Sequence, residues 1–304
     1  MADLRVNVAG VKFQNPLIAA SGTFGFGEEY SEFYPLSKLG GISCKGITPK
    51  KRDGNPPPRI AETPSGILNA VGLQNPGVDY FIKEELPRLS KQGTVIIANV
   101  AGNTYEDYCE MAEKLSNSEV DMIELNISCP NVKAGGVQFG TSCESVAAIT
   151  KAVRPYCKKP LIVKLSPNVT DIASIAKSAE SEGADAVSLI NTITGMRIDI
   201  NTRRPIIKNN TGGLSGAAIF PVAVRMVWQV ANAVKIPIIG MGGISTWKDA
   251  VEMLIAGATA LQIGTVLFSD PYAPIKINDG INAFLEKNGI KSVSELTGSI
   301  RIWE

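Results

Sequence analysis

The sequence of 304 residues contains no histidine. Because histidine is the side chain that most readily moves protons near neutral pH, proton transfer here must use a cysteine, a shifted lysine, a carboxylate or a tyrosine. A thiol, with an unperturbed pKa of about 8.5, is closest to that task. An excess of charge is also missing, since 30 basic and 29 acidic residues give a formal net charge of +1. This balance gives no electrostatic reason to expect a nucleic acid or an anionic membrane as a partner.

Long apolar runs are missing as well. No stretch approaches the roughly 18 apolar residues of a membrane-spanning helix, and the N-terminus has no apolar segment typical of a signal peptide. We therefore expect a soluble protein of the cytoplasm. Hydrophobic residues still make up 44% of the chain, which is enough for a large core. One large α/β domain or two small ones would fit the length; because no linker stands out, we expect a single domain over residues 1–304.

Metal-binding and disulfide patterns are absent from the cysteines, which are Cys44, Cys109, Cys129, Cys143 and Cys157. An odd number without C-x-x-C spacing argues against a disulfide framework and against an iron–sulfur or zinc site within this chain. The G-x-G-x-x-G fingerprint of dinucleotide-binding domains is missing too. Four of the five cysteines are therefore interpreted as small buried hydrophobic residues.

Short apolar runs recur along the chain and are predicted to be strands, at residues 17–20, 41–44, 95–98, 122–125, 161–164, 186–190, 236–240 and 260–263. Amphipathic segments between them predict helices at residues 105–115, 143–153, 171–182, 217–234 and 246–256. Continuous apolar strands that alternate with helices are typical of a parallel sheet. The strand number and chain length favour an α/β fold of the closed (β/α)8 TIM-barrel type over an open sheet.

Two further segments modify this barrel. Residues 6–13 are predicted to form a short N-terminal β-hairpin that closes the barrel floor. The segment at residues 194–216 is too long for a simple connection, and such inserted loops at the C-terminal face of a barrel are usually lids or binding segments.

Polar residues follow the carboxyl ends of the predicted strands, and in a barrel these ends build the site. They include Ser21, Lys45, Asn99, Asn126, Lys164, Asn191 and Thr192. The repeated asparagine and lysine, with few carboxylates, indicate a site of fixed hydrogen-bond donors and acceptors. Such a site fits a large heteroaromatic ligand with an anionic part.

A phosphate site is predicted after the last two strands. Gly242 and Gly243 let backbone amides approach a ligand closely, and the helix that starts at residues 245–246 has an N-terminus that attracts anions. Gly264 and Thr265 follow the next strand, and phosphate sites at this place are common in TIM barrels. The alternative is that these glycines only form tight turns.

More than one role is open for two lysines and one loop. Lys45 and Lys164 either extend to solvent or place positive charge beside a ligand carboxylate or an electron-rich ring, and Lys164 could instead form a Schiff base. The turn-rich loop at residues 69–77 is either a plain surface loop or a nest of amides from residues 71–73 that binds a carboxylate.

The segment Asn-Ile-Ser-Cys-Pro-Asn at residues 126–131 is the most informative in the chain. Pro130 lacks an amide donor, and asparagine and serine favour turns, so the preceding strand ends here. A single thiol, Cys129, is thereby presented among polar side chains. It is either a structural thiol or a general base with access to substrate, and its place on a loop between asparagines favours the base.

This segment resembles the active-site segment of class 1 dihydroorotate dehydrogenases. The resemblance continues in order along nearly the whole chain, at Lys45-Gly46, the loop at residues 69–73, Asn99, Lys164, Asn191-Thr192, Gly216, Gly242-Gly243 and Gly264-Thr265. Class 2 members carry serine at the catalytic position and an N-terminal membrane-associating extension, whereas this chain has Cys129 and no such extension. The continuation Val-Lys-Ala-Gly-Gly-Val-Gln-Phe-Gly at residues 132–140 is similar to the B subtype.

The resemblance implies one FMN per chain, held non-covalently over the barrel mouth. The implied FMN contacts are Ser21, Lys45, Gly46, Asn99, Asn126, Lys164, Ile190, Gly216, Gly242, Gly243, Gly264 and Thr265. The implied substrate contacts are Lys45, Asn69, Val71, Gly72, Leu73, Asn126, Asn131, Asn191 and Thr192. A planar pyrimidine with ring amides and a carboxylate fits these residues, because asparagine supplies matched donors and acceptors and Lys45 supplies positive charge.

The implied reaction oxidises dihydroorotate to orotate in pyrimidine biosynthesis. Cys129 removes a proton from carbon 5, and a hydride leaves carbon 6 for the flavin. Lys45 would favour the thiolate electrostatically. The B subtype implies a partner subunit that carries FAD and a 2Fe–2S cluster and passes electrons to NAD. Two catalytic and two electron-transfer subunits would then assemble around a catalytic homodimer.

Three other functions stay open. The pyrimidine-reducing domain of dihydropyrimidine dehydrogenases shares the barrel, the FMN and a cysteine loop, although the carboxylate-binding loop at residues 69–73 favours orotate. A flavin-free lyase of phosphorylated sugars could use Lys164. A ligand-binding or electron-relay subunit would carry no substrate chemistry. The physiological electron acceptor, NAD or another, is also open.

Overall fold

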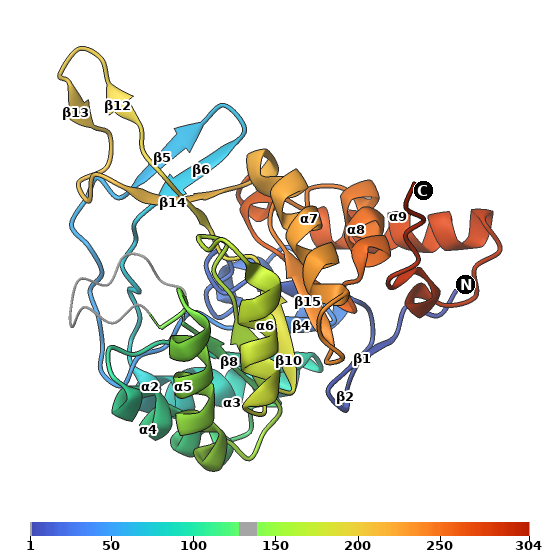
Figure 1. The fold of residues 1–304 in the computed structure, drawn as a ribbon, viewed down its shortest axis with the longest axis horizontal. Coiled ribbons are helices and arrows are strands. Elements are labelled where there is room, and N and C mark those ends of the chain that lie inside the picture. The colour runs from blue at the N-terminus through green and yellow to red at the C-terminus, as the bar shows by residue number, and fades with distance from the viewer. Residues whose placement is uncertain (1, 128–138, 304) are drawn as a thin grey trace.

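The computed structural model describes residues 2–127 and 139–303, so Cys129 and Asn131 lie outside the described residues (Figure 1). Eight parallel strands close into a barrel and confirm the predicted TIM barrel. In chain order they are β3 (Leu17–Ala19), β4 (Gly41–Ser43), β7 (Val95–Val100), β8 (Met122–Asn126), β9 (Leu161–Lys164), β10 (Ala186–Leu189), β15 (Ile238–Met241) and β16 (Ala260–Ile263). Each is almost wholly buried, as strands covered on both faces must be.

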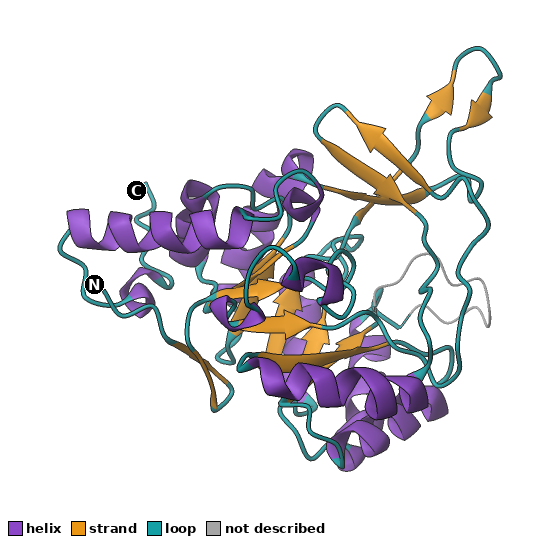
Figure 2. Ribbon diagram, turned by 180° about the vertical axis from the view of Figure 1, so that it is seen from behind, coloured by secondary structure: helices purple, strands orange, loops and turns teal. Residues whose placement is uncertain are grey.

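Helices surround this barrel (Figure 2). The five predicted ones are present as α4 (Tyr105–Ser116), α5 (Cys143–Val153), α6 (Ile172–Ser181), α7 (Phe220–Ala231) and α8 (Trp247–Ala256). The segment before α7 is a separate 3-10 turn, η5 (Ala217–Ile219). Asp171 begins α6 as predicted, because its side chain accepts hydrogen bonds from the amides of Ala173 and Ser174.

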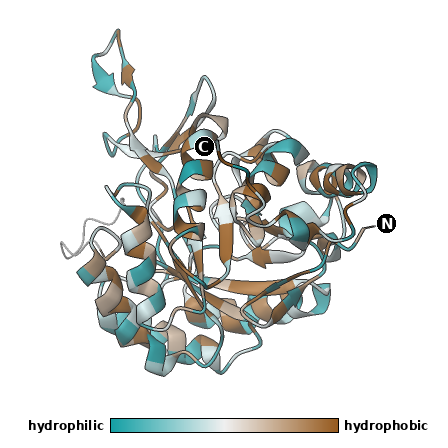
Figure 3. Ribbon diagram, turned by 45° about the vertical axis from the view of Figure 1, so that its right-hand side comes forward, coloured by the Kyte–Doolittle hydropathy of each residue, from teal (hydrophilic) through white to brown (hydrophobic). Residues whose placement is uncertain are grey.

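Other helices were not predicted. They are α1 (Glu28–Ser31), α9 (Ala273–Lys287) and the continuous stretch α2 (Val78–Tyr80), η2 (Phe81–Glu85) and α3 (Leu86–Leu89). Brown and teal alternate along the outer helices in Figure 3, whereas the strands at the centre are mainly brown. Among the described residues, no helix is both long and apolar enough to cross a membrane.

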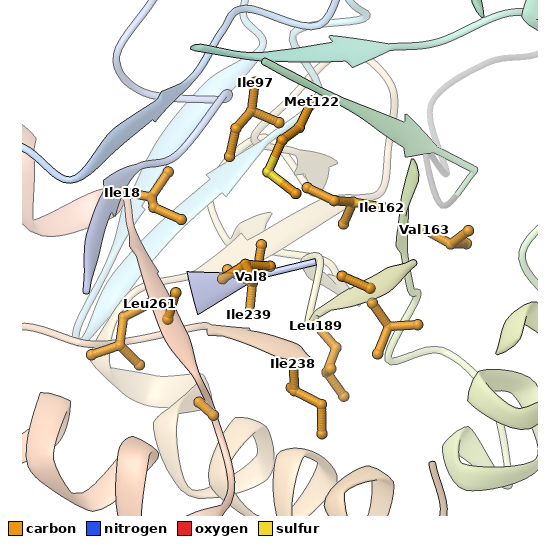
Figure 4. Close-up of a cluster of buried hydrophobic side chains, with 14 of the residues drawn as sticks. Val8, Ile18, Ile97, Met122, Ile162, Val163, Leu189, Ile238, Ile239 and Leu261 are labelled. Carbon is orange, nitrogen blue, oxygen red and sulfur yellow. The ribbon is translucent and has the colours of Figure 1, made fainter. Parts of the chain in front are cut away.

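The barrel interior is built in layers from alternate strands. The register places four isoleucines in one layer, Ile18, Ile97, Ile162 and Ile239, and Figure 4 shows them among the barrel strands. The next layer toward the carboxyl ends comes from the other strands and is polar: Ser43, Glu124, Ser188 and Gln262. All four polar residues are buried. The apolar core therefore ends directly below this buried polar layer, which we call the polar floor.

The predicted N-terminal hairpin is confirmed as β1 (Val6–Val8) and β2 (Val11–Phe13). Val8 is fully buried and lies among the barrel side chains in Figure 4. The buried ring of Phe13 would lie 2.9 Å from a Cβ at Gly41, so a glycine is required where the hairpin meets β4.

The long segment 194–216 forms strands rather than an irregular loop. A four-stranded antiparallel sheet has the order β11 (Ile193–Gly195), β14 (Gly212–Ser215), β6 (Gly66–Asn69) and β5 (Ile60–Thr63). A separate pair, β12 (Ile198–Asp199) and β13 (Arg204–Pro205), lies at the far end of the insertion (Figure 1). Leu68, Ala70 and Ile207 form a small core of their own. The insertions after β4 and β10 thus join each other beyond the carboxyl ends of the barrel strands.

The four described cysteines are free. Cys44 and Cys157 are buried as predicted, but Cys109 and Cys143 are only partly buried, so the prediction of buried thiols is wrong for these two. Both lie on helices, α4 and α5, that face solvent on one side.

Candidate active site

A cavity lies at the carboxyl ends of the barrel strands, below the inserted sheet. Eleven of the predicted site residues line it: Ser21, Asn126, Lys164, Ile190, Asn191, Thr192, Gly216, Gly242, Gly243, Gly264 and Thr265. The described part of the wall also includes residues that were not among the implied ligand contacts: Ala20, Gly22, Thr23, Ser215, Ile219, Met241 and Gln262. Residues far apart in the sequence thus meet at one mouth, as the order of strands in a barrel requires.

Gly242 and Gly243 form a backbone cradle in this cavity. Their φ angles of +121° and +79° are rarely adopted by other residues. A Cβ at Gly243 would lie 2.8 Å from the carbonyl oxygen of Gly216 and 2.8 Å from Cβ of Phe220. Within the described part of the chain, the amides of Gly243, Gly264 and Thr265 have no hydrogen-bond acceptor. These amides can therefore serve an anion.

The backbone amides at the start of α8 have hydrogen-bond acceptors within the helix itself. Thr246 caps the helix, and Oδ2 of Asp249 accepts hydrogen bonds from the amides of Ser245 at 2.9 Å and Thr246 at 2.7 Å. Asp249 thus occupies the amides of Ser245 and Thr246, and the attraction of an anion by this N-terminus stays a prediction. The glycine segments remain as the candidate phosphate site.

Glu124 is the main feature that sequence reasoning missed. Its carboxylate is fully buried on β8, below the cavity. Oε2 accepts hydrogen bonds from Oγ of Ser43 at 2.8 Å and Nδ2 of Asn99 at 2.6 Å. Oε1 accepts from Oγ of Ser188 at 2.7 Å and Nε2 of Gln262 at 2.7 Å. The one signal in the sequence was a glutamate inside an otherwise apolar strand.

The environment keeps this carboxylate ionised at neutral pH. Burial by itself raises the pKa of Glu124, but the positive charge of Lys164 and hydrogen bonds from Ser188, Asn99 and Ser43 outweigh it, so the pKa lies below its ordinary value. Lys164 is itself 5% exposed, which excludes the alternative that it extends to solvent. The polar floor therefore contains a buried negative charge with a buried positive charge nearby.

We expect the substitution Glu124→Gln to destabilise the fold by about 3–5 kcal/mol at pH 7, because it leaves a buried charge without its partner. The folded-state pKa of Glu124 is lowered, so its stabilisation is complete above the unfolded pKa of about 4.3. It is lost as the pH falls through the folded-state pKa. Urea unfolding of both proteins at pH 7 and pH 3 measures this, and the difference should shrink at pH 3. An equal difference at both pH values would contradict it.

A chain of amide side chains connects Glu124 to the cavity. Asn99 donates to Glu124, and its Oδ1 accepts from Nδ2 of Asn126 at 3.3 Å. Oδ1 of Asn126 accepts from Nδ2 of Asn191 at 3.3 Å, and Oδ1 of Asn191 accepts from the amide of Thr192 at 2.9 Å. Asn99 is fully buried beneath Asn126. It supports the cavity wall rather than lining it.

Gln262, a residue of the cavity wall, has a hydrogen-bond acceptor without a donor among the described residues. The residue is 1% exposed and lines the cavity, while its Nε2 is held by Glu124. Its Oε1 is buried and has no hydrogen-bond partner within the described part of the chain. A buried acceptor without a partner is costly. A ligand that donates a hydrogen bond here would remove that cost.

The remaining predicted residues lie outside this cavity: Lys45, Gly46, Asn69, Val71, Gly72, Leu73 and Asn99. Lys45 lines a neighbouring hollow together with Arg52 and Gln74. Burial and the nearby positive charge of Arg59 lower the pKa of Lys45. Among the described residues no carboxylate forms an ion pair with it. A ligand carboxylate would suit this position.

The loop at residues 69–73 has the geometry of an anion-binding nest. Gly72 and Leu73 have consecutive positive φ angles of +78° and +57°. The carbonyl of Val71 is held by the amide of Asn55, while the amides of residues 71–73 have no acceptor in the described part of the chain. Leu73 also reaches the end of β4, since a Cβ at Gly46 would lie 3.3 Å from it. The loop therefore borders Lys45-Gly46 with free donors.

Comparison with known proteins gives one consistent result. A family model described as dihydroorotate dehydrogenase matches residues 3–285. A protein of Bacteroides thetaiotaomicron is 57% identical over 303 residues, which are 99% of this chain and 100% of the relative. A protein of Caldicellulosiruptor saccharolyticus is 58% identical over 300 residues, or 99% and 100% of the two chains. One of Alkaliphilus metalliredigens is 56% identical over 298 residues, or 98% and 99%. Each relative is named dihydroorotate dehydrogenase B (NAD(+)), catalytic subunit.

Proposed function

The chain belongs to the dihydroorotate dehydrogenase family, and from this premise we propose that it is a B-type catalytic subunit that oxidises dihydroorotate to orotate in pyrimidine biosynthesis. The observation that carries the proposal is the cavity at the barrel mouth. Asn126, Lys164, Asn191 and the two glycine segments meet there from separate strands. The mouth of a TIM barrel is the usual place for catalysis.

The cavity residues fit FMN. A flavin mononucleotide has a phosphate, hydroxyl groups and a ring N–H, so it needs free amides at one end and acceptors along its length. The amides of Gly243, Gly264 and Thr265 would hold the phosphate, and Oε1 of Gln262 would accept a hydrogen bond from a hydroxyl or a ring N–H. Lys164 would place its positive charge beside the ring. When bound, FMN supplies the acceptor for the hydride that leaves substrate carbon 6.

The chain's own residues would position the substrate and move one proton. Asn126, Asn131, Asn191 and Thr192 would bind the pyrimidine ring. Its carboxylate would meet Lys45 and the amides of residues 71–73, consistent with the unpaired ammonium and the loop geometry. Cys129 would take the proton from carbon 5 through its thiolate sulfur.

Electron transfer beyond the flavin requires a partner. We propose a second subunit with FAD and a 2Fe–2S cluster that passes electrons to NAD, in an assembly of two catalytic and two electron-transfer subunits in the cytoplasm. In support, relatives that this chain matches over 99–100% of their length are named as catalytic subunits of an NAD(+) enzyme.

A visible spectrum tests the function directly. The purified chain should absorb near 450 nm, and dihydroorotate added without oxygen should bleach this band, whereas dihydrouracil should not. NAD added to the isolated chain should remain oxidised. A colourless protein, bleaching by dihydrouracil in preference to dihydroorotate, or efficient NAD reduction without a partner would each contradict a stated part of the proposal.

A further inference from the structure

We propose that Glu124 is a positioning residue: its buried carboxylate fixes which hydrogen-bonding edge the amide side chains around the cavity present to bound ligands. The identity of those ligands, FMN and orotate, rests on the proposed function. Glu124 does not line the cavity and acts through Asn99 and Gln262, which donate to it.

A carboxylate only accepts hydrogen bonds, whereas an amide side chain has a donor edge and an acceptor edge. Asn99 and Gln262 donate to Glu124 at 2.6 Å and 2.7 Å. Both must therefore turn their NH2 groups toward the carboxylate and their oxygens away from it. In Gln262 the oxygen that results is the buried acceptor without a partner, on a residue that lines the cavity.

The orientation of Asn99 determines that of two further amides. Because its oxygen faces Asn126, Asn126 must offer its NH2 group, and its oxygen then accepts from Asn191. The oxygen of Asn191 accepts from the backbone amide of Thr192, which can only donate. The chain of amides is thus fixed at both ends, by an acceptor that cannot donate and a donor that cannot accept.

The position of Glu124 supports a role beyond packing. Interior layers of TIM barrels are dominated by branched apolar residues, as in the isoleucine layer below. Glu124 instead belongs to a layer whose other members, Ser43, Ser188 and Gln262, all donate to it. A buried charge is weak evidence for stability, because its desolvation is costly. Satisfying it with four donors directly below the cavity is what an orienting role requires.

The substitution Glu124→Gln keeps the size of the side chain and removes its acceptor-only character. The hydroxyls of Ser43 and Ser188 can rotate to accept a hydrogen bond, but the new NH2 group must face either Asn99 or Gln262. The amide side chain that faces the new NH2 group must then rotate so that its oxygen accepts the hydrogen bond. Otherwise two NH2 groups point at each other without an acceptor between them. In either case the side of an amide that faces the ligand no longer presents the original donor or acceptor. We therefore expect FMN or orotate to bind at least about tenfold more weakly.

Two double variants act as matched controls. In Glu124→Gln/Asn99→Asp, the carboxylate at position 99 accepts from the amide at position 124 and from Asn126, which restores the original direction of Asn126. In Glu124→Gln/Gln262→Glu, the carboxylate at position 262 accepts from position 124 and keeps an oxygen toward the cavity. Both doubles keep the net charge of the original chain, which Glu124→Gln alone changes by one.

FMN retention after ultrafiltration of the holoenzyme, orotate titration of the flavin spectrum, and thermal unfolding are compared for all four proteins. We expect the single variant to lose at least about tenfold in one affinity and one double variant to recover it to within about threefold. Wild-type affinities for both ligands in the single variant, or no recovery in either double, would overturn the proposal.

Two outcomes distinguish a failure of the orienting role of Glu124 from a failure of the proposed function. If the original chain binds neither FMN nor orotate, the proposed function fails, and the unfolding temperatures still report whether a double restores the polar floor. If the single variant does not fold, soluble yield and unfolding temperature replace the affinities. Recovery of folding by one double then supports the orienting role, and failure of both to fold overturns it.

Discussion

Replacing Cys129 by alanine is expected to lower the rate of dihydroorotate oxidation by about 10²–10⁴-fold, which is the usual value of a positioned general base. The chain has no histidine to take over. Among the described residues that line the cavity, Lys164 is the only titratable one, and none is a carboxylate, a tyrosine or a cysteine. The positive charge of Lys164 acts on the buried carboxylate of Glu124, which would otherwise be left without a counter-charge. No described side chain of the cavity can therefore replace the thiolate.

Rapid-reaction measurement of flavin bleaching without oxygen isolates this step from electron transfer to a partner. The variant should retain its 450 nm absorbance and its orotate affinity, because the glycine segments and the amide side chains proposed to bind these ligands are unchanged. Cys143→Ala is the matched control, since it removes a partly buried thiol at the start of α5. In the original chain, the rate should fall on acidification through one thiol-like ionisation. Near-normal bleaching by the Cys129→Ala protein at neutral pH would exclude Cys129 as the base.

The barrel could be predicted because its strands satisfy local rules. Runs such as Leu161–Lys164 are short, apolar and β-branched, and their length alone separates them from the helices. Helix starts such as Asp171 also depend on nearby residues only. The long insertion was harder, because β14 pairs with β6, which lies about 145 residues earlier, as in the contact between Asn69 and Gly213 with a separation of 144. No local pattern reports such a pairing.

The polar floor could not be predicted for the same reason. The donors to Glu124 from Ser43, Ser188 and Gln262 are 81, 64 and 138 residues away from it in sequence. Each looks like an isolated polar residue in an apolar strand, and only barrel closure brings them into one layer. The α8 start is a different case. The pattern Thr-x-x-Asp at residues 246–249 is a capping box that the sequence itself displays, and it already indicated that the amide of Thr246 donates to Asp249.

Replacing Gly243 by alanine is expected to weaken FMN binding by about 100-fold. The residue has φ of +79°, and the new Cβ would lie 2.8 Å from the Gly216 carbonyl oxygen and 2.9 Å from the Phe220 backbone nitrogen. Both are backbone atoms, so relief requires the Gly243 segment or the loop at Gly216 to move. Hydrogen bonds to charged groups are worth about 1.5–3 kcal/mol each, and one or two displaced phosphate contacts account for the expected loss. Retained flavin, measured by ultrafiltration and absorbance, reports the affinity.

The control must separate the clash from the strain of a left-handed alanine, which costs roughly 1–2 kcal/mol at any such position. Gly289, just beyond α9, has φ of +67° and nothing within 4 Å of its added Cβ. Gly289→Ala should therefore lower the unfolding temperature by an amount similar to the strain in Gly243→Ala while leaving FMN affinity unchanged. If both variants keep FMN equally well, the amides of the Gly242-Gly243 turn do not hold the phosphate. The anion site would then have to lie at Gly264 and Thr265 alone, whose amides belong to a separate turn.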